Sequence, residues 1–196
     1  MLRLIISAAK DTWQIIFSGV GGQGLVLAGN LLGRAAVEYE GKNAVMTSAY
    51  GVETRGTFTK SDVIISKEEI YYPEVERPDI IIALDSIAYQ RYQAIGEDET
   101  LLVYDSNIAS LSGKEGQVGF PISQIASEVG NPAVANVVSL GILIGLCSVV
   151  SEASASEAIR SEFQARPRLI ETNLRALMEG LRVARETHMN YVHPKE

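Results

Sequence analysis

Short apolar runs alternate along the chain with stretches whose apolar residues recur at helical spacing. Runs rich in Ile and Val predict strands at 13–18, 43–49, 62–66, 79–84 and 101–104. The helical pattern predicts helices at 25–40, 123–129, 136–150, 155–162 and 168–187. This alternation predicts an α/β domain with three layers, a Rossmann-like fold around a mainly parallel sheet.

Two segments depart from simple alternation. Residues 51–60 lack helical character, so the strand at 62–66 is expected to pair with its predecessor as a hairpin, which makes the sheet mixed. The helices after Gly130 have no strand between them and form a C-terminal helical portion. We therefore expect a single domain over 1–196, with its core at about 12–185 and a loose polar tail at 188–196.

The most apolar window, residues 136–150, is shorter than the roughly 18 residues that a membrane span requires. It is predicted to be a buried helix, and the spacing of Gly141 and Gly145 would let a neighbour approach closely. The first 13 residues are too short and too soon interrupted by polar residues for a secretory signal. No membrane association is expected.

Charge and cysteine content narrow the classes of partner. The chain has 17 basic and 24 acidic residues, a net charge of −7, and no Lys/Arg cluster, which argues against nucleic acid. The one cysteine, Cys147, can make neither an internal disulfide nor an iron–sulfur cluster, which normally takes four thiolates. It is predicted to be a buried hydrophobe in a protein of the reducing cytoplasm.

A glycine-rich turn separates the first predicted strand from the first helix. Gly19, Gly21 and Gly24 match G-x-G-x-x-G, and Gly22 and Gln23 lie between them. Glycines let the backbone approach an anion, and the free N–H groups at a helix start stabilise negative charge. The motif is equally compatible with glycines that only permit close packing of strand and helix.

A nicotinamide site would also need an acidic residue at the end of the second strand to bind the ribose hydroxyls. That strand ends instead in Ser48, Ala49 and Tyr50, while Glu38 and Glu40 precede it. The dinucleotide hypothesis therefore lacks one of its parts.

The polar loop that follows the second strand is a second candidate site. It carries Tyr50, Arg55 and Gly56, and the guanidinium of Arg55 could bind a phosphate or carboxylate with two hydrogen bonds. Alternatively, Arg55 and Glu53 pair at the surface, a contribution of roughly 0–1 kcal/mol.

Three further polar residues follow apolar or turn segments. Asp85 and Asp105 each end a predicted strand, which would place both carboxylates at one sheet edge beside the glycine loop. We expect them to cap helices. Asn136 follows Pro132 and either caps the buried helix or contacts another loop.

No residues with the spacing of a Ser-His-Asp set, a metal site or a Walker lysine occur in the sequence. The two histidines, His188 and His193, lie in the tail. The chain is thus expected to hold an anion site without catalytic residues or a bound metal.

Taken together, these motifs resemble the gamma subunit, or gamma domain, of 2-oxoacid:ferredoxin oxidoreductases. The resemblance spans roughly 14–180 and rests on GVGGQG with LAGNLL behind it, YGVETRG, DVIIS, RPDIIIAL and NPAVANVVSLG, with Asn173, Ala176 and Gly180 later on. The family usually has a second glycine after Arg55-Gly56, where this chain has Thr57. That departure leaves the contacts of this loop open.

The resemblance implies a complex that converts a 2-oxoacid and coenzyme A to an acyl-CoA and CO₂ and passes electrons to ferredoxin. Thiamine diphosphate and iron–sulfur clusters would lie on the alpha, beta and ferredoxin-like delta subunits, and this chain would bind no cofactor alone. The glycine loop and Arg55 would contact coenzyme A phosphate at a subunit boundary, or the loop would pack on a neighbouring subunit. An exposed apolar docking surface would favour a homodimer of the isolated chain.

Two other functions remain open from the sequence alone. One is a free enzyme that binds NAD(H) or NADP(H), and the other is a stand-alone coenzyme A- or nucleotide-binding protein. The sequence does not distinguish pyruvate, 2-oxoglutarate and branched-chain or aryl 2-oxoacids as substrates of the complex.

Overall fold

A computed structural model of the protein describes residues 10–50, 57–94, 100–109 and 114–192. A mixed six-stranded sheet in the order β2-β3-β1-β4-β5-β6 lies at its centre. The strands are β1 (Thr12–Val20), β2 (Asn43–Tyr50), β3 (Phe58–Ser66), β4 (Ile80–Ala83), β5 (Leu101–Asp105) and β6 (Gln117–Phe120). The first three are antiparallel neighbours and the last three continue parallel to β1, so the expected hairpin and mixed sheet are confirmed.

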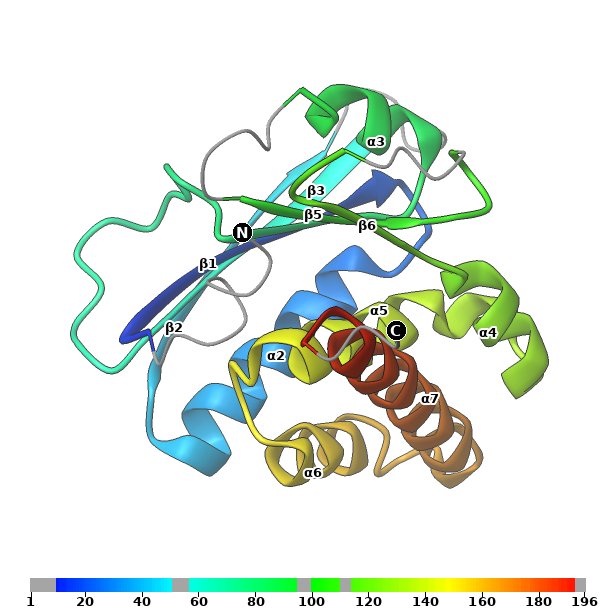
Figure 1. Ribbon diagram of the computed structural model, residues 1–196. Helices are drawn as coiled ribbons and strands as arrows, with labels where there is room; N and C mark the ends of the chain where they lie inside the picture. The colour runs from blue at the N-terminus through cyan, green and yellow to red at the C-terminus, as the bar shows by residue number, and fades with distance from the viewer. Residues whose placement is uncertain (1–9, 51–56, 95–99, 110–113, 193–196) are drawn as a thin grey trace.

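Helices cover both faces of the sheet, which confirms the three-layer α/β prediction (Figure 1). One face is covered by α3 (Ser86–Tyr92), which packs on Ile16, Ile81 and Tyr104. The helices on the other face are α2 (Leu25–Glu40), α4 (Ile122–Val129), α5 (Ala135–Cys147), α6 (Glu152–Glu162) and α7 (Pro167–Val192), together with the 3₁₀ turn η1 (Pro132–Val134). The larger part of the core lies on this second face.

The sequence sets the bounds of α2 clearly. Leu25, Ala28, Leu32 and Ala36 recur at helical spacing and are all buried. Gly24 and Gly41 flank the helix with φ angles of 72° and 63°, a left-handed conformation that glycine adopts without steric cost. The predicted helix and α2 therefore have the same bounds.

Helix α5 is apolar all round because other elements surround it. It packs on α7 with almost no space between the backbones: a Cβ built on Gly141 would lie 2.2 Å from the Leu177 carbonyl oxygen. One built on Gly180 would lie 2.1 Å from the Val138 carbonyl oxygen, and one on Gly145 would lie 2.7 Å from Ala184 Cβ. The predicted close approach at Gly141 and Gly145 is confirmed.

Several elements differ from the sequence prediction. Strand β3 starts at Phe58, before the apolar run, because it pairs along the full length of β1. Strand β6 was not predicted, since its four residues carry little β signal. Helix α5 ends at Cys147, where Ser148 turns left-handed at φ 50°.

A further difference concerns the tail. We expected a loose tail at residues 188–196, and α7 continues as a helix through its first part to Val192. No glycine or proline interrupts the helix between Arg182 and Val192. Residues 193–196 lie outside the described residues.

Cys147 is buried, as predicted, at the end of α5. Burial raises the pKa of its thiol well above the ordinary value, and the charge of Asp79 adds to the rise. In the native protein at about pH 8 we expect no reaction with a disulfide reagent such as DTNB, and one equivalent after unfolding in guanidinium. Rapid labelling of the native protein would contradict this prediction.

Candidate functional site

The glycine loop joins β1 to α2 at the carboxyl end of the central strands. Gly22 and Gly24 have φ angles of 99° and 72°. A Cβ on Gly19 would lie 2.1 Å from Gln23 Oε1, and a Cβ on Gly24 would lie 2.5 Å from Asn136 Nδ2. Three of the loop's glycines are thus required by conformation or close contact.

The side chain of Gln23 ties two strand ends together. Its Oε1 accepts a hydrogen bond from the Val20 amide at 2.9 Å, and its Nε2 donates to the Leu84 carbonyl oxygen at 3.0 Å. Val20 ends β1, and Leu84 follows β4. β1 and β4 are neighbouring strands, and the chain continues from β1 toward one side of the sheet and from β4 toward the other. Folds of this type bind dinucleotides in the crevice at such a point. Gln23 bridges the two strand ends at this point and lines the pocket beside them.

The backbone amides of the loop fall into two groups. Gly21 N–H donates to the Thr57 carbonyl oxygen and Gln23 N–H donates to the Val20 carbonyl oxygen, each at 3.3 Å. Within the described residues, the amides of Gly22 and Gly24 have no acceptor. Helix α2 also starts without a side-chain cap. The donors available to an anion are therefore those of Gly22, Gly24 and the first turn of α2.

Asn136 brings α5 against the loop. It is buried, its Nδ2 donates to the Gly24 carbonyl oxygen at 2.9 Å, and its Oδ1 accepts from the Val137 amide at 2.9 Å. Of the two roles that the sequence left open for Asn136, the contact with another loop is present, with Asn136 as the donor. This bond fixes the N-terminus of α2 against the C-terminal helices.

A pocket of about 330 Å³ opens beside the loop. It is lined by residues that follow β1, β4 and β5 and that begin α4, η1 and α5: Gly22, Gln23, Leu84, Asp105, Ser123, Pro132, Ala133 and Ala135. No local pattern in the sequence marks the residues of η1 and α4 as neighbours of the glycine loop. The pocket's concave shape and the nearby amides would suit part of an extended phosphate-bearing ligand.

Asp85 caps a helix, as expected, whereas Asp105 bonds a turn and the start of a helix that lies further along the chain. Asp85 Oδ1 accepts from the Ile87 amide at 2.9 Å and caps α3. Asp105 is buried, and its two oxygens accept from the amides of Asn107 at 3.1 Å and Ser123 at 3.0 Å. Asp105 thereby ties β5 to the start of α4, and its negative charge in the pocket wall is satisfied by backbone donors.

The second candidate loop is described only at its ends. Tyr50 is the last residue of β2 and pairs in register with Thr59, whereas Arg55 and Gly56 lie outside the described residues. Thr57, the departure from the family pattern, accepts the Gly21 N–H through its backbone oxygen. Among the predicted site residues, the structure brings together Gly19, Gly21, Gly22, Gln23, Gly24 and Asn136. Tyr50 lies at the end of β2.

Two properties of the described part of the chain bear on other classes of function. No group of His, Cys, Asp or Glu side chains there could hold a metal ion. None of the helices there is both long and apolar enough to cross a bilayer.

Comparison with known proteins agrees with the motifs and the fold. The family model described as pyruvate ferredoxin/flavodoxin oxidoreductase matches residues 14–183. The 2-oxoglutarate synthase subunit KorC of Methanocaldococcus jannaschii is 40% identical over 88% of this chain and 94% of its own length. The ketoisovalerate oxidoreductase subunit VorA of Methanothermobacter thermautotrophicus is 35% identical over 88% of this chain, which spans 36% of that longer protein.

A solved structure is similar over nearly its full length. The gamma subunit of a keto/oxoacid ferredoxin oxidoreductase from Geobacter sulfurreducens superposes with a TM-score of 0.75 at 35% identity, covering 88% of this chain and 98% of that one. The family match extends over both the sheet and the C-terminal helices. The chain therefore belongs to the pyruvate ferredoxin/flavodoxin oxidoreductase family.

Proposed function

We propose that this chain is the gamma subunit of a cytoplasmic 2-oxoacid:ferredoxin oxidoreductase. The complex would convert a 2-oxoacid, coenzyme A and two oxidised ferredoxins to acyl-CoA, CO₂, a proton and two reduced ferredoxins. The observation that carries the proposal is the near-complete coverage of both chains in the match to KorC. Alpha, beta and ferredoxin-like delta subunits would supply thiamine diphosphate and the iron–sulfur clusters.

Within this role, the glycine loop is proposed to bind a phosphate of coenzyme A at a subunit boundary. The unpaired amides of Gly22 and Gly24, the uncapped start of α2 and the adjoining pocket of about 330 Å³ support this assignment. Arg55 and Gly56 lie one or two residues before Thr57, whose carbonyl oxygen contacts the loop. A 2-oxoglutarate:ferredoxin oxidoreductase from Magnetococcus marinus, which shares this fold over 32% of its chain, has been solved with coenzyme A bound.

Co-expression tests the subunit role. The chain is produced with its partner subunits, and the purified complex is assayed with 2-oxoglutarate, pyruvate and 2-oxoisovalerate for coenzyme A-dependent reduction of ferredoxin. We expect the complex to contain this chain, to be active, and to prefer 2-oxoglutarate, the 2-oxoacid in the names of the KorC relatives. A fully active complex without this chain would refute the subunit role.

A charge placed in the loop tests coenzyme A binding separately. Gly22→Glu adds a carboxylate at an open position, where it would repel an incoming phosphate. We expect the KM for coenzyme A to rise at least about tenfold, with the KM for the 2-oxoacid unchanged.

Gly41→Glu is the matched control, because Gly41 also has a positive φ and open space but lies at the far end of α2. An unchanged KM for coenzyme A in the Gly22→Glu complex would refute the phosphate site while leaving the subunit role intact.

A further inference from the structure

The connection between β3 and β4, residues 67–79, forms a second surface at the end of the sheet opposite the glycine loop. We propose that this connection, here called the tyrosine loop, docks against a basic surface of another subunit of the complex, with Tyr71 and Tyr72 as its contact residues. The inference rests on the proposed subunit role, and it is independent of the ligand assigned to the glycine loop.

The tyrosine loop contains no helix or strand, yet its base is held against β1. Gln14 Oε1 accepts hydrogen bonds from the amides of Glu76 at 2.9 Å and Arg77 at 3.0 Å. The amide of Lys67 donates to the Asp11 carbonyl oxygen at 2.9 Å. Connections of more than about 12 residues without secondary structure are uncommon and are usually either disordered or functional. Because hydrogen bonds hold both ends of this one, a binding role fits it better.

Two tyrosine side chains lie at the tip of the loop, in contact with solvent. Tyr71 is 88% exposed and Tyr72 is 54% exposed. The Tyr71 hydroxyl donates to Glu69 Oε2 at 2.8 Å, two residues away. The Tyr72 hydroxyl donates in the same way to Glu74 Oε2 at 2.9 Å. Tyrosine is among the residue types that contribute most to binding at protein interfaces, so this pair is the natural contact of the loop.

The loop also carries negative charge that this chain does not compensate. Residues 68–76 contain no Lys or Arg, and their four glutamates are Glu68, Glu69, Glu74 and Glu76. Among the described residues, none of the four forms an ion pair.

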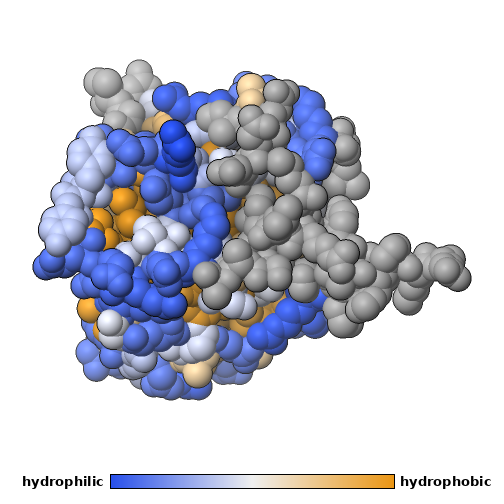
Figure 2. Space-filling view, turned by 60° about the vertical axis from the view of Figure 1, so that its left-hand side comes forward, coloured by the Kyte–Doolittle hydropathy of each residue, from blue (hydrophilic) through white to orange (hydrophobic). Residues whose placement is uncertain are grey.

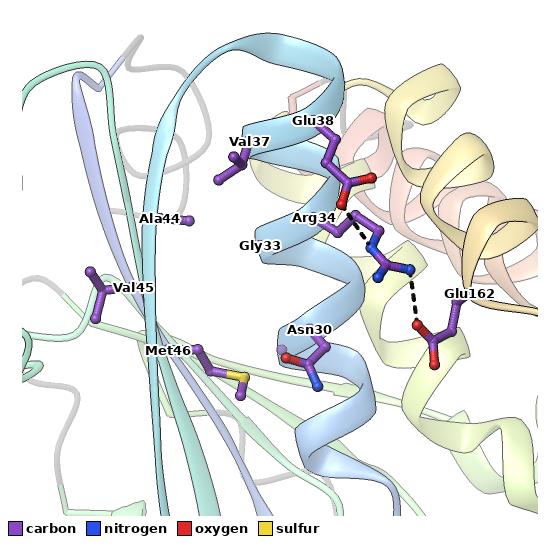
Figure 3. A pocket seen from close by; sticks show the side chains of 10 residues that line it. Asn30, Gly33, Arg34, Val37, Glu38, Ala44, Val45, Met46 and Glu162 are labelled. Carbon is purple, nitrogen blue, oxygen red and sulfur yellow. Dashed lines mark hydrogen bonds and ion pairs between the residues drawn. The ribbon is translucent and has the colours of Figure 1, made fainter.

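Glutamates in the helices of the same chain are mostly paired with Arg or Lys. Figure 3 shows one such network in the groove between α2 and β2. There, Arg34 pairs with Glu38 at 3.1 Å and with Glu162 at 3.0 Å. The unpaired glutamates of the tyrosine loop therefore differ from the ordinary charged surface of this protein.

Rings and charge together select the kind of partner. An arginine-rich surface would suit both, because a guanidinium binds carboxylates with two hydrogen bonds and also stacks on aromatic rings. Figure 2 turns the left-hand side of Figure 1, where the tyrosine loop lies, toward the viewer, and this face is largely hydrophilic. Since the whole chain carries a net charge of −7, a second copy would bring like charges together. A basic surface on a different subunit avoids that repulsion.

Competition for a place in the complex tests the proposal. A variant and a differently tagged wild-type chain are co-expressed with the partner subunits, and their ratio in the purified complex is measured by mass spectrometry. We expect Tyr71→Ala and Glu68→Lys each to be depleted at least about fivefold, as suits changes at the centre of an interface. The thermal unfolding of the isolated variants should match the wild type, because both side chains are exposed.

Two matched variants control for the type of substitution. Tyr39→Ala removes another exposed tyrosine, on α2, and Glu128→Lys reverses another exposed charge, on α4. Both should enter the complex as readily as the wild type. Equal depletion of the loop variants and the control variants would overturn the proposal.

Hydrogen exchange separates this inference from the subunit role. Amides of residues 67–79 should exchange more slowly in the assembled complex than in the lone chain. A complex that contains the chain but leaves these amides unprotected would overturn the inference and keep the subunit role. Normal assembly of the loop variants with a raised KM for ferredoxin would also overturn it, because the loop would then contact the electron acceptor. Failure of the wild-type chain to enter any complex would instead refute the subunit role.

Discussion

Replacing Gly141 with alanine should lower the free energy of unfolding by about 2 kcal/mol or more, the cost expected when a core without free space is overpacked. The added Cβ would lie 2.2 Å from the Leu177 carbonyl oxygen and 3.0 Å from the Leu181 amide nitrogen. Both contacts are backbone atoms of α7, so the two helices would have to separate. Alanine is otherwise more favourable than glycine inside a helix by about 1 kcal/mol. A measured loss of unfolding free energy is therefore due to the packing contact.

Gly33→Ala is the matched control, because Gly33 is also inside a helix. A Cβ there would meet only Ala44 Cβ, at an ordinary 3.8 Å. This variant should gain up to about 1 kcal/mol. Urea denaturation of both variants measures the difference, and equal changes in the same direction would contradict the close packing of α5 on α7.

Replacing Gly24 with alanine should also be strongly destabilising, by about 3 kcal/mol, from left-handed backbone strain and overpacking together. Gly24 has φ 72°, and its added Cβ would lie 2.5 Å from Asn136 Nδ2. That buried amide could move only by giving up its 2.9 Å hydrogen bond to the Gly24 carbonyl oxygen.

Gly41→Ala separates the two contributions. Gly41 has φ 63° at the other end of the same helix, with nothing within 4 Å of an added Cβ, so it should lose only about 1–2 kcal/mol through strain. In a double-mutant cycle, Gly24→Ala combined with Asn136→Ala should cost less than the sum of the two single changes. Additive losses would show that Asn136 does not contact the loop.

Local signals predicted the elements that fill the centre of the fold. β4 and β5 are buried along their length, and their continuous apolar runs identified them. The positions of Gly24 and Gly41 identified the ends of α2. Local signals failed where pairing decides the structure: Phe58–Ser61 is polar in part but pairs with the end of β1, and Gln117–Phe120 becomes a strand only through β5.

The candidate site likewise has one part that local sequence signals predict and another part that they do not. The glycine motif, its place between strand and helix, and the cap at Asp85 follow from residues close in the chain. The bonds from Gln23 to Leu84 and from Asn136 to Gly24 join residues 61 and 112 positions apart. No periodicity or spacing in one sequence encodes such pairs, so the sequence marked Gln23 as a ligand donor and missed its side chain's role in the fold.

The two hydrogen bonds of the Gln23 side chain have a consequence for preorganisation. They join the ends of β1 and β4 directly beside the backbone amides of Gly22 and Gly24. An anion that meets these amides would find their positions already fixed by the fold, so its binding would order little additional chain.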